Sequence, residues 1–328
     1  MIRYLSELSL EAFIEAARNV PYQQINSDLF PGIDLWIRRD DLIDPLISGN
    51  KAYKLIYNLL EARAQGKNTI VTCGGAWSNH LHATAAAGQR FGFKTVGIIR
   101  GERPPVLSAM LQDAERFGME LRFVSRAEYR KRYDPSFLAL VGQKLDNSWF
   151  VPEGGANIQG ARGVQILGRS INEVSPTRFD EYWLACGTGL TLGALAAVLP
   201  GDCTVYGVPV LKAERAIRGD ALDWAQRLSS HHCKIKLIEG AHCGGYAKVD
   251  TRLAKFIETS GSLLAVPLDR VYGAKVALQL NLAGGLSGPA SERVRKERRV
   301  LMIHTGGLQG ERGSVDFQPV STINVQSL

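Results

Sequence analysis

The sequence has no stretch suited to crossing a membrane or to directing secretion. Nowhere in its 328 residues do apolar side chains approach the roughly 20 in a row that a membrane-spanning helix needs. The N-terminal segment with Glu7 and Glu11 is amphipathic and lacks the run of roughly 7 to 15 apolar residues that a secretory signal contains. We therefore expect a cytoplasmic protein with no membrane partner.

Cysteine is scarce and irregularly placed. There are only 5 cysteines, an odd number, and no two stand in a Cys-x-x-Cys arrangement, so a disulfide framework is not expected. His231, His232 and Cys233 are followed by His242 and Cys243, but this spacing fits no standard zinc pattern. No metal site is therefore expected.

Acidic residues are outnumbered by basic ones, and the net charge is +7. The densest basic run, residues 293–299, follows Pro289 and Ser291 like a short helix and precedes an apolar strand at 300–303. A nucleic-acid site would interleave aromatic residues with the basic ones, and this run has none. We interpret the run as a solvated helix face and expect no nucleic-acid partner. The surplus charge would act as a diffuse attraction for anionic ligands.

Predicted strands and helices alternate along most of the chain. A chain of 328 residues exceeds the size at which one core usually keeps growing, so two lobes with a cleft between them are expected. Short apolar runs that alternate with helical periodicity are typical of buried parallel sheets. The fold class is therefore α/β, with two open, mostly parallel, twisted sheets flanked by helices. The predicted helices cover residues 53–65, 79–90, 159–171 and 190–198, with one more ending before Gly118, and the predicted strands cover 69–73, 95–99, 121–124, 182–185 and 203–208.

Two lysines stand where local electrostatics disfavours them. Lys51 and Lys54 follow Gly49 and Asn50 close to the start of a predicted helix, whose N-terminus carries partial positive charge. A long lysine can reach solvent, which is the simplest interpretation of a single one. The functional interpretation is that two neighbouring positive charges and partial burial push Lys51 toward its neutral amine, the form that condenses with an aldehyde.

A glycine-rich turn between a strand and a helix offers a site for an anion. Residues 186–193 read Cys-Gly-Thr-Gly-Leu-Thr-Leu-Gly, so backbone N–H groups, hydroxyls and a helix N-terminus converge there. The segment has neither the lysine of a P-loop nor the spacing of a dinucleotide fingerprint, which favours a single phosphate over ATP or NAD. Taken alone, it is equally compatible with a structural turn.

A second such turn covers residues 74–80, Gly-Gly-Ala-Trp-Ser-Asn-His. Ser78 or Asn79 can cap the following helix, and the N–H groups of the turn could equally hold a carboxylate. Ser78 could also relay a proton, whereas His80 and His82 could lie along the helix without touching a ligand. Tyr246, Tyr272 and Thr305 are likewise flanked by glycines that would allow a ligand to approach, although a turn with a packed side chain explains any one of them.

Together these motifs resemble one group, the fold-type II (tryptophan synthase β-like) enzymes that depend on pyridoxal 5′-phosphate (PLP). Within it they resemble the 1-aminocyclopropane-1-carboxylate (ACC) deaminase/D-cysteine desulfhydrase family, whose members are commonly homodimers. We expect residues 1–50 and 160–328 to form a larger cofactor-binding lobe and residues 51–159 a smaller substrate-side lobe, with PLP in the cleft between them. The matching segments occur in the family's order and are residues 48–51 with Lys54, 74–75 with 78–80, 153–155, 187–189 and 304–307.

The resemblance also implies a role for each motif. Lys51 would carry the cofactor as a Schiff base and move the Cα proton. Asn79 would contact the ring hydroxyl, and Thr305 would hydrogen-bond the pyridine nitrogen. Ser78, with the backbone of Asn79 and His80, would take the substrate carboxylate or assist proton transfer. The remaining positions are the phosphate cradle at Gly187, Thr188, Gly189, Leu190 and Thr191, the nearby cofactor-side residues Asn50 and Lys54, and the substrate-facing Tyr246 and Tyr272.

The implied reaction is α,β-elimination or deamination of a small amino acid, by a lyase or hydrolase that releases ammonia and a 2-oxo acid. A neutral threonine at the ring nitrogen leaves the pyridine less electron-withdrawing than an acid would, which suits β-elimination better than transamination. ACC deaminases read Tyr-Glu-Gly-Lys and Ser-Asn-Gln, whereas this chain has Gly273 after Tyr272 and His80 after Asn79. These departures favour a D-cysteine desulfhydrase-like activity, although Trp77 and His82 replace the Gln and Arg expected there, and such members usually read Tyr-Thr-Gly-Lys.

Three alternatives stay open at the level of sequence. The first is another β-eliminating or β-replacing type II enzyme, such as a serine or threonine dehydratase or a relative of cysteine synthase. The second is a PLP-binding protein without turnover. The third discards PLP and makes the turn at Gly187 a nucleotide site.

Overall fold

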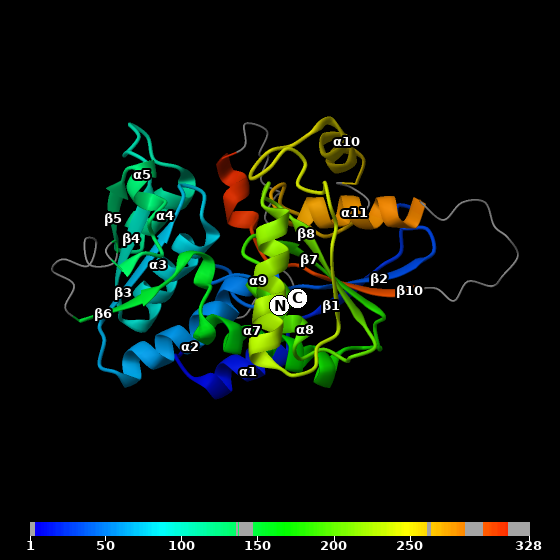
Figure 1. The fold of residues 1–328 in the computed structure, drawn as a ribbon, viewed down its shortest axis with the longest axis horizontal. Helices are drawn as coiled ribbons and strands as arrows, with labels where there is room; N and C mark the ends of the chain where they lie inside the picture. The colour runs from blue at the N-terminus through cyan, green and yellow to red at the C-terminus, as the bar shows by residue number, and fades with distance from the viewer. Residues whose placement is uncertain (1–3, 136, 138–146, 261–263, 286–297, 314–328) are drawn as a thin grey trace, which may run out of the picture.

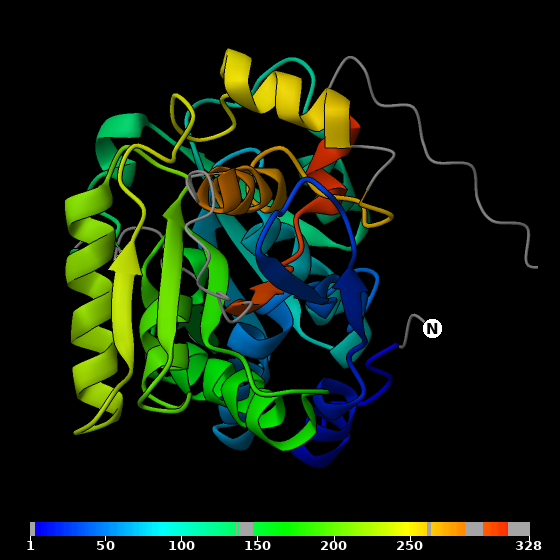
Figure 2. The same ribbon diagram turned by 90° about the vertical axis from the view of Figure 1, so that its right-hand side faces the viewer.

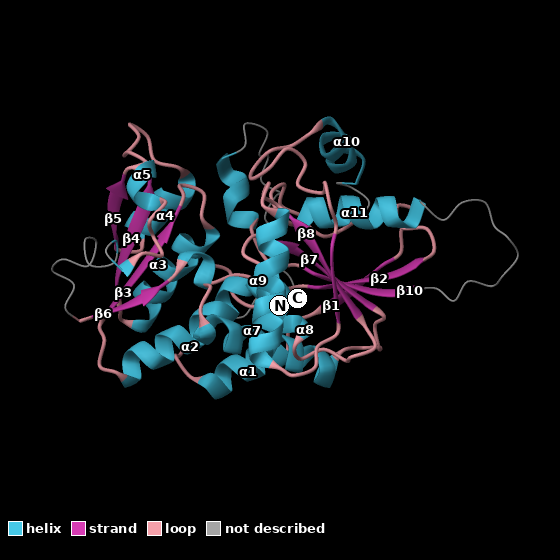
Figure 3. Cartoon of the chain, in the orientation of Figure 1, coloured by secondary structure: helices cyan, strands magenta, loops and turns pink. Residues whose placement is uncertain are grey.

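The chain folds into two α/β lobes that lie side by side (Figure 1). The computed structural model describes residues 4–135, 137, 147–260, 264–285 and 298–313. Each lobe contains one sheet with helices against it, which confirms the α/β class and the two mostly parallel sheets (Figure 3). Within the described ranges, no helix is long and apolar enough to cross a membrane.

The larger sheet joins segments from both ends of the chain. Its strand order is β1-β2-β10-β7-β8-β9, so β10, late in the sequence, lies between the early β2 and the central β7. All neighbouring pairs run parallel except β1 and β2. The strands are β1 (Tyr22–Ile25), β2 (Ile33–Arg38), β7 (Glu181–Cys186), β8 (Thr204–Pro209), β9 (Lys234–Leu237) and β10 (Arg298–Ile303).

Helices cover both faces of this sheet. Val300 and Met302 of β10 pack into one apolar cluster, and Leu301 and Ile303 pack into another on the opposite face. A strand buried on both faces is apolar at consecutive positions, as observed. Figure 2 shows α10 (yellow) and α11 (orange) on the other side of the strands from α7 and α8 (green). The helices of the first face are α10 (Thr251–Ser260) and α11 (Gly273–Gly285), and those of the second are α1 (Leu10–Arg18), α7 (Ile158–Val174), α8 (Leu190–Ala196) and α9 (Glu214–Leu228).

The smaller sheet is entirely parallel, in the order β5-β4-β3-β6. One face packs against α3 and α4 through Leu81 and Leu111, and the other packs against α5 through Tyr129. Its strands are β3 (Thr69–Gly74), β4 (Lys94–Arg100), β5 (Met119–Val124) and β6 (Ser148–Val151), and its helices are α3 (Asn79–Phe91), α4 (Ala109–Arg116) and α5 (Arg126–Tyr129).

Two helices join the lobes. Helix α2 (Asn50–Ala64) packs along α7 so closely that a Cβ on Gly163 would lie 1.7 Å from the backbone oxygen of Tyr53. One apolar cluster is continuous through this contact, because it contains Ile70 of the smaller sheet and Leu301 of the larger. The lobe boundaries at residues 51 and 159 stay a prediction.

The predicted helices and strands are confirmed, with ends that differ by a few residues, as helix ends commonly do. Helix α2 begins at Asn50 rather than at residue 53, so Lys51 lies inside its first turn. The N-terminal amphipathic segment forms α1, which Ser9 caps through its side chain. The basic run at 293–297 lies outside the described residues, whereas Arg298 and Arg299 begin β10.

Candidate active site

The turns that follow β2, β3, β7 and β10 meet between the two lobes. Ligands of parallel α/β sheets bind at the carboxyl ends of the strands, where such turns lie. The backbone of Asn50 bonds to Thr305, more than 200 residues away in sequence, and its side chain bonds to Thr191 after β7. The turn after β3 approaches through Asn79, whose Oδ1 lies 4.0 Å from the Cβ position of Gly310 after β10. The five motifs singled out in the sequence are therefore parts of one site.

The turn that carries Lys51 is in backbone contact with the turn after β10. Gly49 has a φ of +64°, and a Cβ at this position would lie 2.0 Å from the backbone oxygen of Thr305. The next residue, Asn50, donates its backbone N–H to the same oxygen at 3.2 Å. Only glycine allows this combination of a left-handed conformation and a close approach.

Lys51 is partly buried, and its Nζ lies 2.8 Å from Oδ1 of Asn50. Burial lowers the pKa of Lys51 to about 8. Roughly one molecule in ten would then hold a neutral amine at pH 7. The sequence predicted a lowered pKa from burial and from the charge of Lys54. Burial is the cause found for Lys51, whereas the charge of Lys51 helps to lower the pKa of Lys54 well below its usual value.

Asn50 and Lys54 connect the Lys51 turn to two other motifs. Asn50 donates its side-chain N–H to Oγ1 of Thr191 at 3.1 Å, which connects the helix start to the glycine-rich turn after β7. Lys54 donates from Nζ to the backbone oxygen of Gly154 at 3.0 Å. Both side chains are buried. Thr191 thus uses its hydroxyl inside the protein, whereas a Cβ on Gly187 would meet open space.

The turn after β3 presents polar groups that have no protein partner. Ser78 caps α3, because its Oγ accepts the N–H of Leu81 at 3.3 Å. Among the described residues, Oδ1 of Asn79 and both ring nitrogens of His80 are buried without a hydrogen bond. Burial, Lys51 and Lys54 hold the pKa of His80 well below its usual value, so its imidazole is neutral. Leaving such groups unpaired costs about 1 to 3 kcal/mol each, which points to a ligand as their partner.

Two tyrosines approach the same turn from the larger lobe. The hydroxyls of Tyr246 and Tyr272 are 3.3 Å apart, and Tyr246 also donates to the backbone oxygen of Trp77 at 3.1 Å. Burial raises the pKa of both tyrosines, so both hydroxyls are protonated at neutral pH. With the Tyr246 proton donated to Trp77, Tyr272 is the donor within the pair, so the two hydroxyls form a hydrogen-bonded chain that ends on the turn after β3.

Asp269 and Lys275 hold this tyrosine pair in place. The buried carboxylate of Asp269 accepts the N–H groups of Val271, Tyr272 and Gly273 at 2.7–3.0 Å. Burial raises the pKa of Asp269 to about 6. Lys275 donates from Nζ to the backbone oxygens of His242 and Gly245, both at 2.8 Å, and so fixes the loop before Tyr246.

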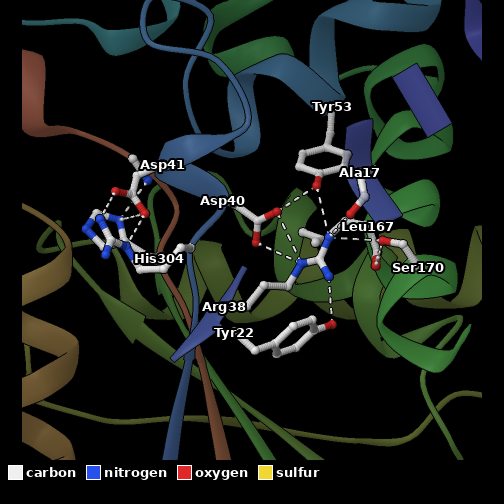
Figure 4. A network of polar contacts seen from close by, with 11 residues as sticks. Ala17, Tyr22, Arg38, Asp40, Asp41, Tyr53, Leu167, Ser170 and His304 are labelled. Carbon is white, nitrogen blue, oxygen red and sulfur yellow. Dashed lines mark hydrogen bonds and ion pairs between the residues drawn. The ribbon is translucent and has the colours of Figure 1, made fainter. Parts of the chain in front are cut away.

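A buried network beneath the Lys51 turn was missed by sequence reasoning (Figure 4). Arg38 and Asp40 form a completely buried ion pair at 3.2 Å, and the hydroxyl of Tyr53 donates to Asp40 at 2.6 Å. The backbone oxygen of Asp40 accepts the N–H of Gly49 at 3.1 Å, so the network supports the turn directly. Its only sequence signal is a run of charged residues, 38–41, at the end of an apolar strand.

The two histidines of α3 have different surroundings. His80 faces the site, with its Cε1 3.4 Å from the Cβ position of Gly155. His82 instead contacts Asp113 at 3.2 Å. Among the described residues, no group of three or more His, Cys, Asp or Glu could hold a metal ion.

These residues fit PLP. A partly neutral lysine amine is present for the aldehyde, and unpaired polar atoms of Asn79 and His80 stand next to it. The turn at Gly187 has an open side for the phosphate. Thr305 lies beside the Lys51 turn. Its side chain forms no hydrogen bond among the described residues, so its hydroxyl is available to bond a ring nitrogen. The assignment of each residue to a part of the cofactor stays a prediction.

Comparison with known proteins gives a consistent result. A family model described as "Pyridoxal-phosphate dependent enzyme" matches residues 16–306. A putative 1-aminocyclopropane-1-carboxylate deaminase of Thermotoga maritima is 31% identical over 85% of this chain and 90% of its own length. The bifunctional D-cysteine desulfhydrase/1-aminocyclopropane-1-carboxylate deaminase of Arabidopsis thaliana is 28% identical, over 95% of this chain and 82% of that protein. The crystal structure of an ACC deaminase homologue has the same fold, with a TM-score of 0.76 at 24% identity over 89% of this chain and 90% of that one.

Proposed function

Because this chain belongs to the pyridoxal-phosphate dependent enzymes, we propose that it deaminates a small amino acid by α,β-elimination and releases ammonia and a 2-oxo acid. The observation that carries the proposal is the partly buried Lys51 amine, with its pKa lowered to about 8 and its charge within electrostatic reach of the unpaired His80 ring. When bound, the cofactor withdraws electrons from the substrate's α-carbon. The protein then needs only a base at that carbon and groups that orient the substrate.

The residues of this chain would divide the work as follows. Lys51 Nζ holds the aldehyde and later moves the α-proton, while Asn79 and Thr305 orient the ring through its hydroxyl and its nitrogen. The turn of Ser78, with the backbone of Asn79 and His80, binds the substrate's carboxylate. The phosphate cradle consists of Gly187, Thr188, Gly189, Leu190 and Thr191, with Asn50 and Lys54 on its other side, and Tyr246 and Tyr272 supply protons near the leaving group.

A D-cysteine desulfhydrase-like activity is preferred over ring opening of ACC. Gly273 occupies the position at which ACC deaminases have glutamate. A Cβ there would lie 3.2 Å from both Oδ1 of Asp269 and a side-chain carbon of Leu268, so a larger side chain would require these two neighbours to shift. The alternatives are another type II β-eliminating or β-replacing enzyme, such as a serine or threonine dehydratase or a cysteine synthase relative, and a PLP-binding protein without turnover.

We also propose a cytoplasmic homodimer and retain the lobe boundaries at residues 51 and 159. The chain aligns with 90% of the length of the Thermotoga maritima relative and of the ACC deaminase homologue. Size-exclusion chromatography with light scattering would test the dimer.

Two measurements on the purified protein test the function. The first is absorbance near the edge of the visible range, recorded for the wild type, for Lys51→Ala and for the control Lys94→Ala, an exposed lysine at the start of β4. The wild type and the control should show the absorbance band, and borohydride reduction should attach the absorbing cofactor covalently to the protein. Lys51→Ala should lose it, and a fixed band in this variant would refute the assignment of Lys51.

The second measurement is release of 2-oxo acid and ammonia from D- and L-cysteine, D- and L-serine and ACC. Pyruvate from D-cysteine is expected. Pyruvate from serine alone would favour a dehydratase. A band that shifts with none of these amino acids, together with no product, would favour a binding protein without turnover.

A further inference from the structure

Arg100 ends strand β4 at the edge of the smaller sheet from which the turn after β3 also emerges. Gly74 pairs with Ile99 in the sheet, so Arg100 lies next to Gly75. Its guanidinium covers that glycine, because Nη2 lies 3.5 Å, and Nε and Cζ both lie 3.9 Å, from the Cβ position of Gly75. A planar cation therefore rests on the turn that leads to Ser78.

The positive charge of Arg100 forms no ion pair within the described part of the chain. No carboxylate there pairs with Arg100, although its side chain is exposed enough to reach one. Glu153, the acidic residue of the nearby Glu-Gly-Gly motif, is already bound to Arg132 at 2.6 Å and to Tyr129 at 2.8 Å. Other arginines of the smaller lobe are paired, namely Arg90 with Asp44, Arg103 with Glu115, Arg116 with Asp113, Arg122 with Glu120 and Arg132 with Glu153.

Arg100 faces the substrate side of the site. Its positive charge lowers the pKa of Tyr246 against the larger, opposite effect of burial, so the guanidinium is within electrostatic reach of that tyrosine. The Tyr246 hydroxyl in turn lies against the backbone oxygen of Trp77 and the hydroxyl of Tyr272. The guanidinium of Arg100, on Gly75, and the hydroxyl of Tyr246, on Trp77, thus lie against neighbouring residues of the same turn.

We propose that Arg100 binds a second anionic group of the substrate, in addition to its α-carboxylate, so that the preferred substrates are small amino acids whose β-substituent carries a carboxylate, sulfonate or phosphate. This proposal rests on the proposed function. The α-carboxylate already has the N–H groups at the start of α3 and the Ser78 hydroxyl, three residues beyond Gly75. A guanidinium presents paired donors that match the geometry of a second oxyanion.

The turnover experiment compares alanines that carry a neutral β-chloro group with alanines that carry a β-phosphate ester or a β-sulfonate, in both enantiomers. The wild type should show at least a ~10-fold higher kcat/KM for an anionic member than for the chloro compound. Loss of a charge-assisted, paired contact should lower kcat/KM of Arg100→Gln by ~10- to 100-fold for anionic substrates and by less than ~3-fold for the chloro compound. The control Arg103→Gln, which removes the same charge from a surface pair, should change neither.

A binding experiment separates failure of this proposal from failure of the proposed function. Calorimetric titration of the holoenzyme with succinate and with butyrate compares a dicarboxylate with a monocarboxylate of the same carbon-chain length and needs no turnover. Succinate should bind at least ~10-fold more tightly, and Arg100→Gln should reduce that ratio to below ~3. If Arg100→Gln weakens the binding of succinate and butyrate equally, Arg100 binds the α-carboxylate. If it weakens the binding of neither, Arg100 is a surface arginine that binds no ligand. Either result overturns the proposal, whether or not the enzyme forms a 2-oxo acid.

Discussion

Around Lys51 the chain is held by a completely buried ion pair and by a glycine in backbone contact. Tyr246 instead meets Trp77 through a hydrogen bond between partly exposed groups, and buried Asp269 and Lys275 hold the two tyrosine segments from behind. Under the proposed function, we assign the first region to the cofactor and the second to the substrate. Two of the four positions at which this chain departs from the motifs of the family, Trp77 and Gly273, lie in the second region. The comparison separates a backbone contact that constrains the Lys51 turn from a side-chain hydrogen bond that joins Tyr246 to Trp77.

On the cofactor side, the largest loss of stability is expected where two backbone segments are in contact. Gly49→Ala would place a Cβ 2.0 Å from the backbone oxygen of Thr305 at a φ of +64°. We expect a loss on the order of 3 kcal/mol or more in the free energy of unfolding, from strain and overpacking together. Gly92→Ala is the matched control, because Gly92 has a φ of +75° with nothing within 4 Å, and it should lose only about 1 kcal/mol.

Urea unfolding of both glycine variants measures this difference, and the absorbance retained after gel filtration reports the bound cofactor. Gly49→Ala should lose the cofactor, and Gly92→Ala should keep it. Equal stability of the two variants would mean that the contact between the Lys51 turn and Thr305 is not a constraint.

Lys51→Met should stabilise the cofactor-free protein at neutral pH. The pKa of Lys51 is lowered from 10.5 to about 8, so folding disfavours its protonated form. The cost is fully present below about pH 8 and disappears as the pH rises toward 10.5, because the unfolded chain then also loses the proton. Removing the charge should add about 3 kcal/mol at pH 7 and almost nothing at pH 10.5.

Urea midpoints of Lys51→Met and the wild type at these two pH values measure the effect, with Lys94→Met as the control at an exposed lysine. A gain that is the same at both pH values would come from the apolar side chain rather than from the buried charge. No gain at pH 7 would contradict the lowered pKa.

The smallest effect is expected on the substrate side. Tyr246→Phe removes the hydrogen bonds to Trp77 and Tyr272 but leaves the ring in place. We expect a loss of roughly 0.5 to 1.5 kcal/mol, or about 3- to 10-fold in kcat/KM, with cofactor affinity unchanged. Tyr206→Phe, which loses only an exposed contact with Lys236, should change neither quantity. A loss of cofactor in Tyr246→Phe would remove the distinction between the two sides.

Much of the site could be predicted from local sequence. The lysine at the helix start, the glycine turn at 187–189 and the N-cap Ser78 follow from rules that involve neighbouring residues only. The predicted strands and helices followed from periodicity for the same reason. The buried network of Arg38, Asp40 and Tyr53 could not be predicted, because its partners come from β2 and α2 and meet only when the strand end packs beneath the helix start.

The sequence by itself determined the α/β class, the order of the motifs and the chemistry available at each one, since these depend on residue type and spacing. Only the tertiary structure decided which groups are free to act. It engages Thr191 with Asn50 and Glu153 with Arg132, and it leaves Asn79, His80 and Arg100 without protein partners among the described residues. Burial and pairing depend on contacts between segments far apart in the chain, and those contacts set the pKa of Lys51.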